Sequence, residues 1–122
     1  MQSKSITVTS KGVELGKLEV EPLTKDIPIR AAKLLRKEKN KKYIAGDMDV
    51  EERAEFNAEC IRLILVSLTL ADGTRPLLGK SEENVRRFLL ADENEWIFRV
   101  AEKEAVKLAD EAKVEFEVTS GN

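Results

Sequence analysis

This 122-residue chain contains no histidine and one cysteine, so the residues first considered for chemistry are its carboxylates and the single thiol of Cys60. One copy therefore cannot form a Ser-His-Asp or Cys-His triad, a Cys/His zinc site or an internal disulfide. Without an imidazole to activate its thiol, we expect Cys60 to be a small buried apolar group. We therefore expect a protein that is not an enzyme and has no catalytic, cofactor-binding or metal-binding residue.

Two further patterns are weak signals of chemistry. Glu52, Glu55 and Glu59 recur on one face of a predicted helix, but a carboxylate di-metal centre also needs histidine ligands, so we interpret this face as solvated. Gly79-Lys80-Ser81 ends like a phosphate-binding loop but lacks the first glycine of that motif. We treat it as chance and leave open a weak anion site at the following helix N-terminus.

Charge is distributed unevenly along the chain. Residues 1–46 carry 11 Lys/Arg and 5 Asp/Glu, a net charge of +6, whereas residues 47–122 carry 10 and 18, a net charge of −8. Such asymmetry occurs in nucleic-acid contact, in head-to-tail self-association and on ordinary solvated surfaces. We interpret it here as an ordinary solvated surface.

The sequence shows no membrane-spanning or export signal. No stretch approaches the ~20 apolar residues that cross a bilayer. The first residues are followed by no apolar run of the signal-peptide type. We expect a cytoplasmic protein.

The first 22 residues have the pattern of a β-hairpin. Ser5–Ser10 alternates apolar and polar residues, and Lys11-Gly12 supplies a turn. We expect Gly16 to mark a bulge or kink in the second strand, and Pro22 to end it.

Residues 28–113 have the periodicity of four helices, so we predict a mostly α (α+β) single domain, a four-helix domain with a small N-terminal β-hairpin. Capping patterns at Asp49, Ser81 and Asp92 mark three of the helix starts. The predicted helices cover Pro28–Lys42, Val50–Leu70, Glu82–Ala91 and Asp92–Lys113. Residues 114–122 are left open as a tail, a strand or an arm that orders on a partner.

Apolar periodicity assigns a buried face to each helix. The first helix has a thin stripe of Ile29, Ala32 and Leu35, with Tyr43 as a further member. The last has Ile97, Ala101, Leu108 and Ala112. The segment Cys60–Leu70 is apolar nearly all round, so we expect it at the centre of the core.

This order of features resembles the tail assembly chaperones of long non-contractile-tailed bacteriophages, the siphophage type. The resemblance covers most of the chain and rests on the leading strand pair, the basic first helix and these segments: Glu21–Thr24, Phe56–Leu70, Asp72–Leu78, Glu82–Leu89, and a last helix with Val100, Ala101, Ala105 and Leu108.

The resemblance implies a viral tail assembly protein of a phage or prophage, acting in the host bacterial cytoplasm. Several copies would coat the tape measure protein, a very long helical protein that sets tail length, until the tail tube protein polymerises around it. In that family a frameshifted longer form commonly recruits the tube protein, and this chain would correspond to the short form or to a relative without a long form. We therefore expect both proteins as partners and a homo-oligomer.

A chaperone of helices must offer its partner an apolar groove. We place this groove at the leucine pair that follows the Asp72-Gly73 turn and at the apolar residues near the next helix: Leu77, Leu78, Phe88, Leu89 and Trp96. The alternative left open is that all five are core residues.

Two other functions are left open. One is a small nucleic-acid-binding or regulatory protein that uses the basic segment 36–42, with Arg36, Lys37, Lys39, Lys41 and Lys42. Only Tyr43 gives that segment aromatic support, so nucleic acid is not the partner we expect. The other is a structural virion or neck component.

Overall fold

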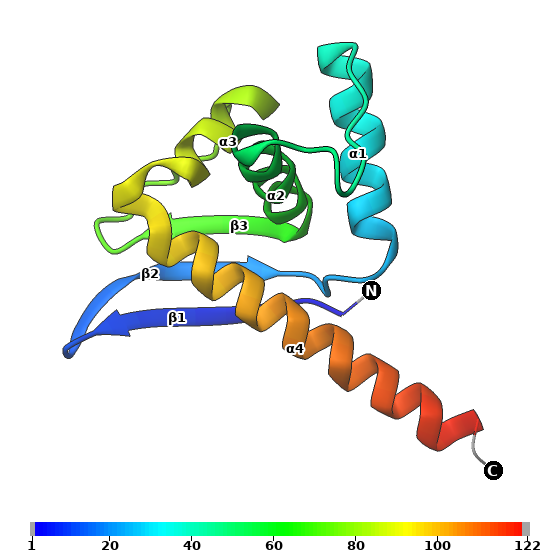
Figure 1. Ribbon diagram of the computed structural model, residues 1–122. Coiled ribbons are helices and arrows are strands. Elements are labelled where there is room, and N and C mark those ends of the chain that lie inside the picture. The colour runs from blue at the N-terminus through cyan, green and yellow to red at the C-terminus, as the bar shows by residue number, and fades with distance from the viewer. Residues whose placement is uncertain (1, 121–122) are drawn as a thin grey trace.

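The computed structural model describes the backbone of residues 2–120 and the side chains of residues 2–112. Along the chain lie β1 (Lys4–Ser10), β2 (Val13–Val20), α1 (Asp26–Lys39), α2 (Val50–Ile64), β3 (Leu65–Leu70), α3 (Glu82–Leu90), the 3₁₀ turn η1 (Asp92–Asn94) and α4 (Glu95–Ser120), as drawn in Figure 1.

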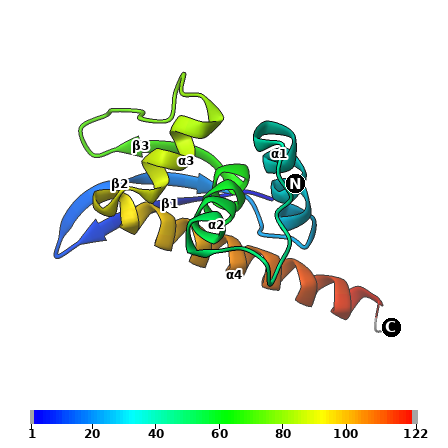
Figure 2. The same ribbon diagram turned by 45° about the horizontal axis from the view of Figure 1, so that its top comes forward.

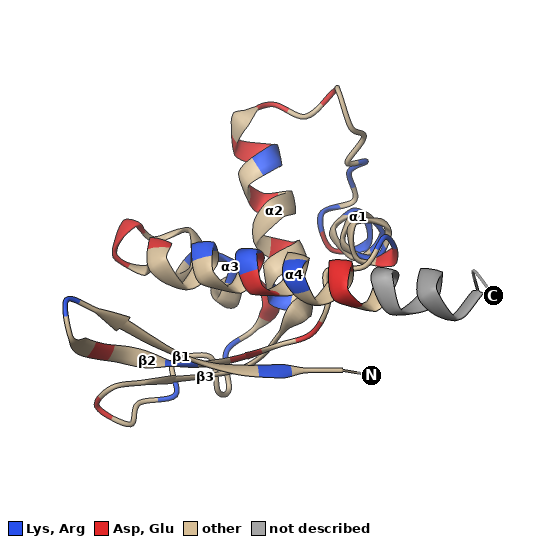
Figure 3. Cartoon of the chain, turned by 90° about the horizontal axis from the view of Figure 1, so that it is seen from below, with Lys and Arg blue, Asp and Glu red and all other residues tan. Residues whose placement is uncertain are grey.

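The three strands form one antiparallel sheet in the order β1-β2-β3. All four α-helices lie on the same side of this sheet, as Figure 3 shows, which gives one helical layer over one sheet face. The prediction of an α+β domain that is mostly helical, with an N-terminal hairpin, is confirmed.

The hairpin turn lies where the sequence predicted it. Lys11 has φ 51° and Gly12 has φ 79°, the positive values that match a tight turn to the right-handed twist of its strands. The β1–β2 register shifts between Val8, which pairs with Gly16, and Thr9, which pairs with Glu14. The bulge predicted at Gly16 is thus found directly beside it.

Strand β3 is the largest departure from the sequence prediction, which placed Leu65–Leu70 in a buried helix. Helix α2 ends at Ile64, and the chain continues in extended conformation against β2, with Leu68 opposite Leu18. Ser67-Leu68-Thr69-Leu70 alternates with the period of a strand, but each neighbouring leucine also fits a buried helix. Pairing with β2, more than forty residues away in sequence, decides between the two.

Helix starts agree with the capping patterns at two of three places. Asp49 accepts a hydrogen bond from the Glu52 backbone N–H, and the Glu52 side chain accepts one in return, a complete capping box. Ser81 caps α3 through the Asn84 N–H. The predicted box at Asp92 is wrong: η1 occupies that position, and α4 begins at Glu95.

The first helix begins and ends earlier than predicted. Its C-terminus is set by Asn40, whose φ of 52° places it in the left-handed region that commonly stops a helix. Starting at Asp26, α1 buries Ile27, Ala31 and Leu35, so the predicted stripe is right for Leu35 and for Tyr43, which is buried just after the helix, and wrong for Ile29 and Ala32. Ile29 is 60% exposed instead.

The last helix confirms three residues of its predicted stripe, whereas the fourth, Ala112, is only half-buried, and the helix extends beyond its predicted end. Ile97, Ala101 and Leu108 are buried against the core, and Ala105 joins them. Residues 114–118, left open as tail, strand or arm, have helical backbone as part of α4. The side chains of residues 113–122 lie outside the described part of the chain.

The core is formed where the inner sheet face meets α2, α3 and α4. Leu18 and Val20 of β2 are buried with Ile61, Ile64 and Ile97 of the helices. Figure 2 shows α4 crossing beneath the strands. Helix α4 is also tied to the segment after β2, because the Leu23 N–H donates to the Ala105 carbonyl at 3.0 Å.

At Gly16 the backbone of β3 and the Trp96 side chain leave no room for a Cβ atom. A Cβ placed there would lie 2.7 Å from the Thr69 carbonyl oxygen and 3.3 Å from Cη2 of Trp96. We expect Gly16→Ala to lower the free energy of unfolding by about 2 kcal/mol through overpacking, measured by urea denaturation. The neighbouring exposed change Lys17→Thr is the control and should cost less than about 0.5 kcal/mol. Equal stability of the two variants would contradict this tight contact.

Candidate protein-binding site

The five residues predicted to line one groove lie in different surroundings. Leu89 is 2% exposed and belongs to the core, so its assignment to a surface groove is wrong. Phe88 and Trp96 are half-buried and pack against the core. Leu77 and Leu78 lie in the loop between β3 and α3, and Leu78 is 72% exposed. Leu77 is half-buried and packs against the core as Phe88 and Trp96 do, so Leu78 alone of the five is fully exposed.

The leucine pair borders a hollow of about 240 Å³ beside strand β3. The strand forms one wall, and the loop with the start of α3 forms the other. The lining comprises Arg62, Leu65, Val66, Ser67, Leu68, Arg75, Leu77, Leu78, Lys80, Glu82 and Val85. We call this hollow the β3-edge site.

The position of β3 at the edge of the sheet gives the site its backbone chemistry. The Leu70 N–H faces away from β2 and donates to the Thr74 carbonyl at 2.8 Å. Alternate residues of a strand direct their backbone groups to the same side, so the N–H and C=O of Leu68 also face away from β2. Such an edge can pair with an extended segment of another chain.

The loop wall of the site is held by its own hydrogen bonds. The Asp72 carboxylate accepts the Thr74 N–H at 2.9 Å. Hydrogen bonding by the Thr74 side chain, and then by this N–H, holds the pKa of Asp72 below its usual range. The Leu78 N–H donates to the Arg75 carbonyl at 3.2 Å, and the Lys80 N–H to the Leu77 carbonyl at 3.3 Å. These turns hold the leucine pair beside β3.

Arg62, which lines the site from α2, is held by a buried group of charges that the sequence analysis missed. Glu59 is fully buried and accepts hydrogen bonds from Arg62 Nε at 2.6 Å and Nη2 at 2.8 Å, and from Arg86 Nη1 at 3.0 Å. Arg86, itself 2% exposed, also pairs with Glu38. This group, the Glu59 network, joins α1, α2 and α3 and orients Arg62 in the wall of the site.

Glu59 was predicted to lie on a solvated face, which is wrong. Burial alone would raise the pKa of Glu59, but hydrogen bonds and charges from Arg62 and Arg86 outweigh it and place the pKa below the usual range. A signal was present in the spacing, since Arg62 follows Glu59 by three residues, a helical ion-pair spacing. The partner from α3 is distant in sequence and gave no such signal.

Glu52 and Glu55, the other two carboxylates of the predicted solvated face, each have a partner just after the end of α1. Glu52 pairs with Lys41, which lowers the pKa of Glu52, and Glu55 accepts a hydrogen bond from the Tyr43 hydroxyl. Burial, followed by this hydrogen bond, raises the pKa of Tyr43. Among the side chains of residues 2–112, no group of three or more His, Cys, Asp or Glu residues is arranged to hold a metal ion.

The predicted basic patch is partly neutralised. Lys39 lies 3.5 Å from Glu55 and 3.2 Å from Glu83, and Lys41 pairs with Glu52. The other three residues of the patch, Arg36, Lys37 and Lys42, are exposed.

Cys60 is buried as predicted. Its side chain belongs to the core, and burial, with a smaller effect of Glu59 and Glu102, raises the pKa of the thiol to about 11. At neutral pH it is therefore protonated and poorly nucleophilic.

Comparisons with known proteins find no match to this chain among family models, curated proteins or solved structures. Within the described residues, no helix is both long and apolar enough to cross a bilayer.

Removing the charge of Glu59 tests how much the Glu59 network stabilises the fold. We expect Glu59→Gln to lower the free energy of unfolding by about 3 kcal/mol, because Arg86 would remain buried with one partner fewer. The exposed change Glu102→Gln serves as control.

The Glu59 effect should depend on pH in a defined direction. A carboxylate whose pKa is lowered by folding stabilises the fold above its unfolded pKa of about 4.3, and this stabilisation is lost as the pH falls toward its folded pKa. The stability difference between wild type and Glu59→Gln should therefore shrink from pH 6 to about pH 3. A difference that stays constant over that range would contradict a charged Glu59.

Proposed function

We propose that this protein is a non-enzymatic assembly chaperone of the phage tail type, which binds the tape measure protein through the β3-edge site. The observation that carries the proposal is the apolar surface at this edge, where Val66 is 49% exposed and Leu78 is 72% exposed beside an unpaired side of β3. Exposed apolar side chains around a hollow are a common mark of protein interaction sites.

The chemistry of the site fits a partner of varied sequence. Backbone groups of Leu68 can pair with any extended segment, and Leu77 and Leu78 offer apolar contact without demanding one partner residue. A helical partner would use the apolar contacts alone. One such contact is weak, but many copies along one long client would bind strongly through avidity.

The proposal places the protein in the bacterial cytoplasm, where several copies cover apolar segments of the client until the tail tube protein replaces them. The helical part of the four-helix domain then serves as a scaffold that fixes the edge and its loop. The buried thiol of Cys60, with its raised pKa, fits a protein that acts by binding.

The test is co-expression of the full chain with a phage tape measure protein, with soluble client as the readout. We expect Leu78→Asp to reduce soluble client roughly tenfold, since a charge would enter the apolar contact. Leu90→Asp is the matched control, because Leu90 is 43% exposed but lies outside the β3-edge site. Circular dichroism verifies that both variants fold.

If both variants keep the client equally soluble, the β3-edge site is not where the client binds. If the wild type fails to solubilise the client at all, the chaperone proposal itself is wrong.

A further inference from the structure

A second hollow, of about 220 Å³, lies on α1 and the segment that follows it. It is lined by Ala32, Lys33, Arg36, Lys42, Tyr43 and Ile44, and we call it the α1 hollow. Its lining combines apolar surface with three cationic side chains and includes no carboxylate. Ile44 is 50% exposed.

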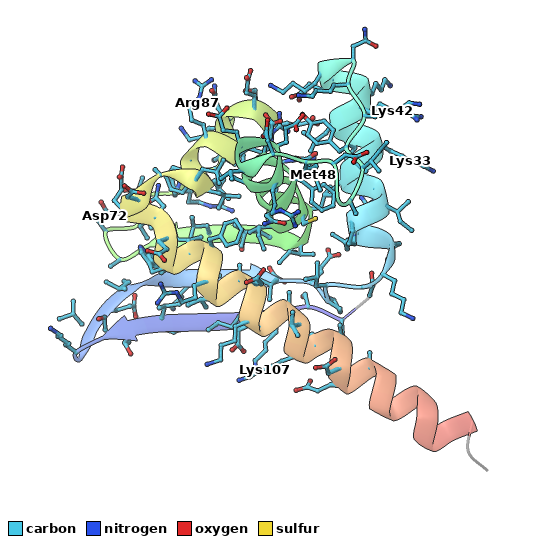
Figure 4. All side chains as sticks on the ribbon, in the orientation of Figure 1. Lys33, Lys42, Met48, Asp72, Arg87 and Lys107 are labelled. Atoms are coloured by element: carbon cyan, nitrogen blue, oxygen red, sulfur yellow. The ribbon has the colours of Figure 1, made fainter. Side chains whose placement is uncertain are left out.

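The three cations of this hollow differ from their basic neighbours. Lys39 and Lys41 are engaged by carboxylates of α2 and α3. Within the described side chains, Lys33, Arg36 and Lys42 have no carboxylate within ion-pair distance. Figure 4 shows Lys33 and Lys42 extending away from the body of the molecule. The hollow therefore presents three uncompensated positive charges around an apolar surface.

A segment of complementary character occurs at the other end of the same chain. Residues 110–122 contain four carboxylates and one lysine, a net charge of −3 against the +3 of the hollow. Apolar residues alternate with the acidic ones in Val114-Glu115-Phe116-Glu117-Val118, which includes one aromatic residue. An acidic segment with an aromatic anchor is the kind of ligand that a cationic, apolar hollow accommodates.

We propose that the segment 110–118 of one copy binds the α1 hollow of a second copy. Figure 1 shows the C-terminal part of α4 projecting beyond the sheet, where a second molecule could reach it. Because the two contacting surfaces are different, each copy offers one hollow and one segment, and the contact can repeat head to tail. The asymmetry between the basic and acidic halves of the sequence is then the basis of self-association.

The test uses the purified full-length protein without a client, so its failure is separate from failure of the chaperone proposal. Sedimentation equilibrium should show a mass that rises with protein concentration and falls as salt is added. Two charge-reversed variants are compared: Lys33→Glu with Arg36→Glu in the hollow, and Glu115→Lys with Glu117→Lys in the segment. Each should weaken self-association at least roughly tenfold.

Mixing the two variants is the decisive step. The unchanged acidic segment of the first matches the unchanged hollow of the second, and the reversed segment of the second matches the reversed hollow of the first. An equimolar mixture should therefore recover association that neither variant shows alone. Lys11→Glu with Lys103→Glu is the control, because it makes the same charge change at exposed positions outside the hollow and should leave association unchanged.

Three results would overturn the proposal. The first is a wild-type protein that stays monomeric at all concentrations. The second is a mixture that does not recover association. The third is a hollow variant that associates like wild type but loses co-purifying nucleic acid, which would assign the surface to phosphate binding. Circular dichroism confirms that each variant is folded.

Discussion

The helical layer depends on the buried ionic contact between Glu59 and Arg86. Arg86 comes from α3, Glu59 from α2, and Glu38 of α1 reaches the same guanidinium. Taking these charges out of water is costly, and the cost is offset only while the partners keep this geometry. The network therefore favours one arrangement of three helices over alternatives in which a charge would be buried alone.

This constraint explains how a small domain keeps an apolar edge open without collapsing onto it. The side chains of Arg62 and of Arg86 on α3 are held by Glu59. The loop after β3 is held by its own turns and by the Asp72 cap. The loop and Arg62 are thus held in place before a partner binds, which lowers the ordering cost of binding.

Local signals in the sequence predicted the parts of the fold that local interactions determine. The hairpin at Lys11-Gly12 and the helix starts at Asp49 and Ser81 each depend on residues at most a few positions apart. Strand β3 could not be found this way, because its helical and extended conformations bury the same leucines and only pairing with β2 distinguishes them. The candidate site also combines local and long-range features. Leu77 and Leu78 were predicted from the turn that precedes them, whereas strand β3 and the buried Glu59 depend on contacts with residues distant in sequence.

If a client binds along the open side of β3, amide hydrogen exchange followed by mass spectrometry should detect the contact there. Amide exchange of the full chain is measured alone and with a saturating amount of a tape measure segment. Binding at the β3-edge site should slow amide exchange in residues 66–70 and 75–81 of the bound protein. Protection confined to other elements, with unchanged exchange in β3 and its loop, would contradict it.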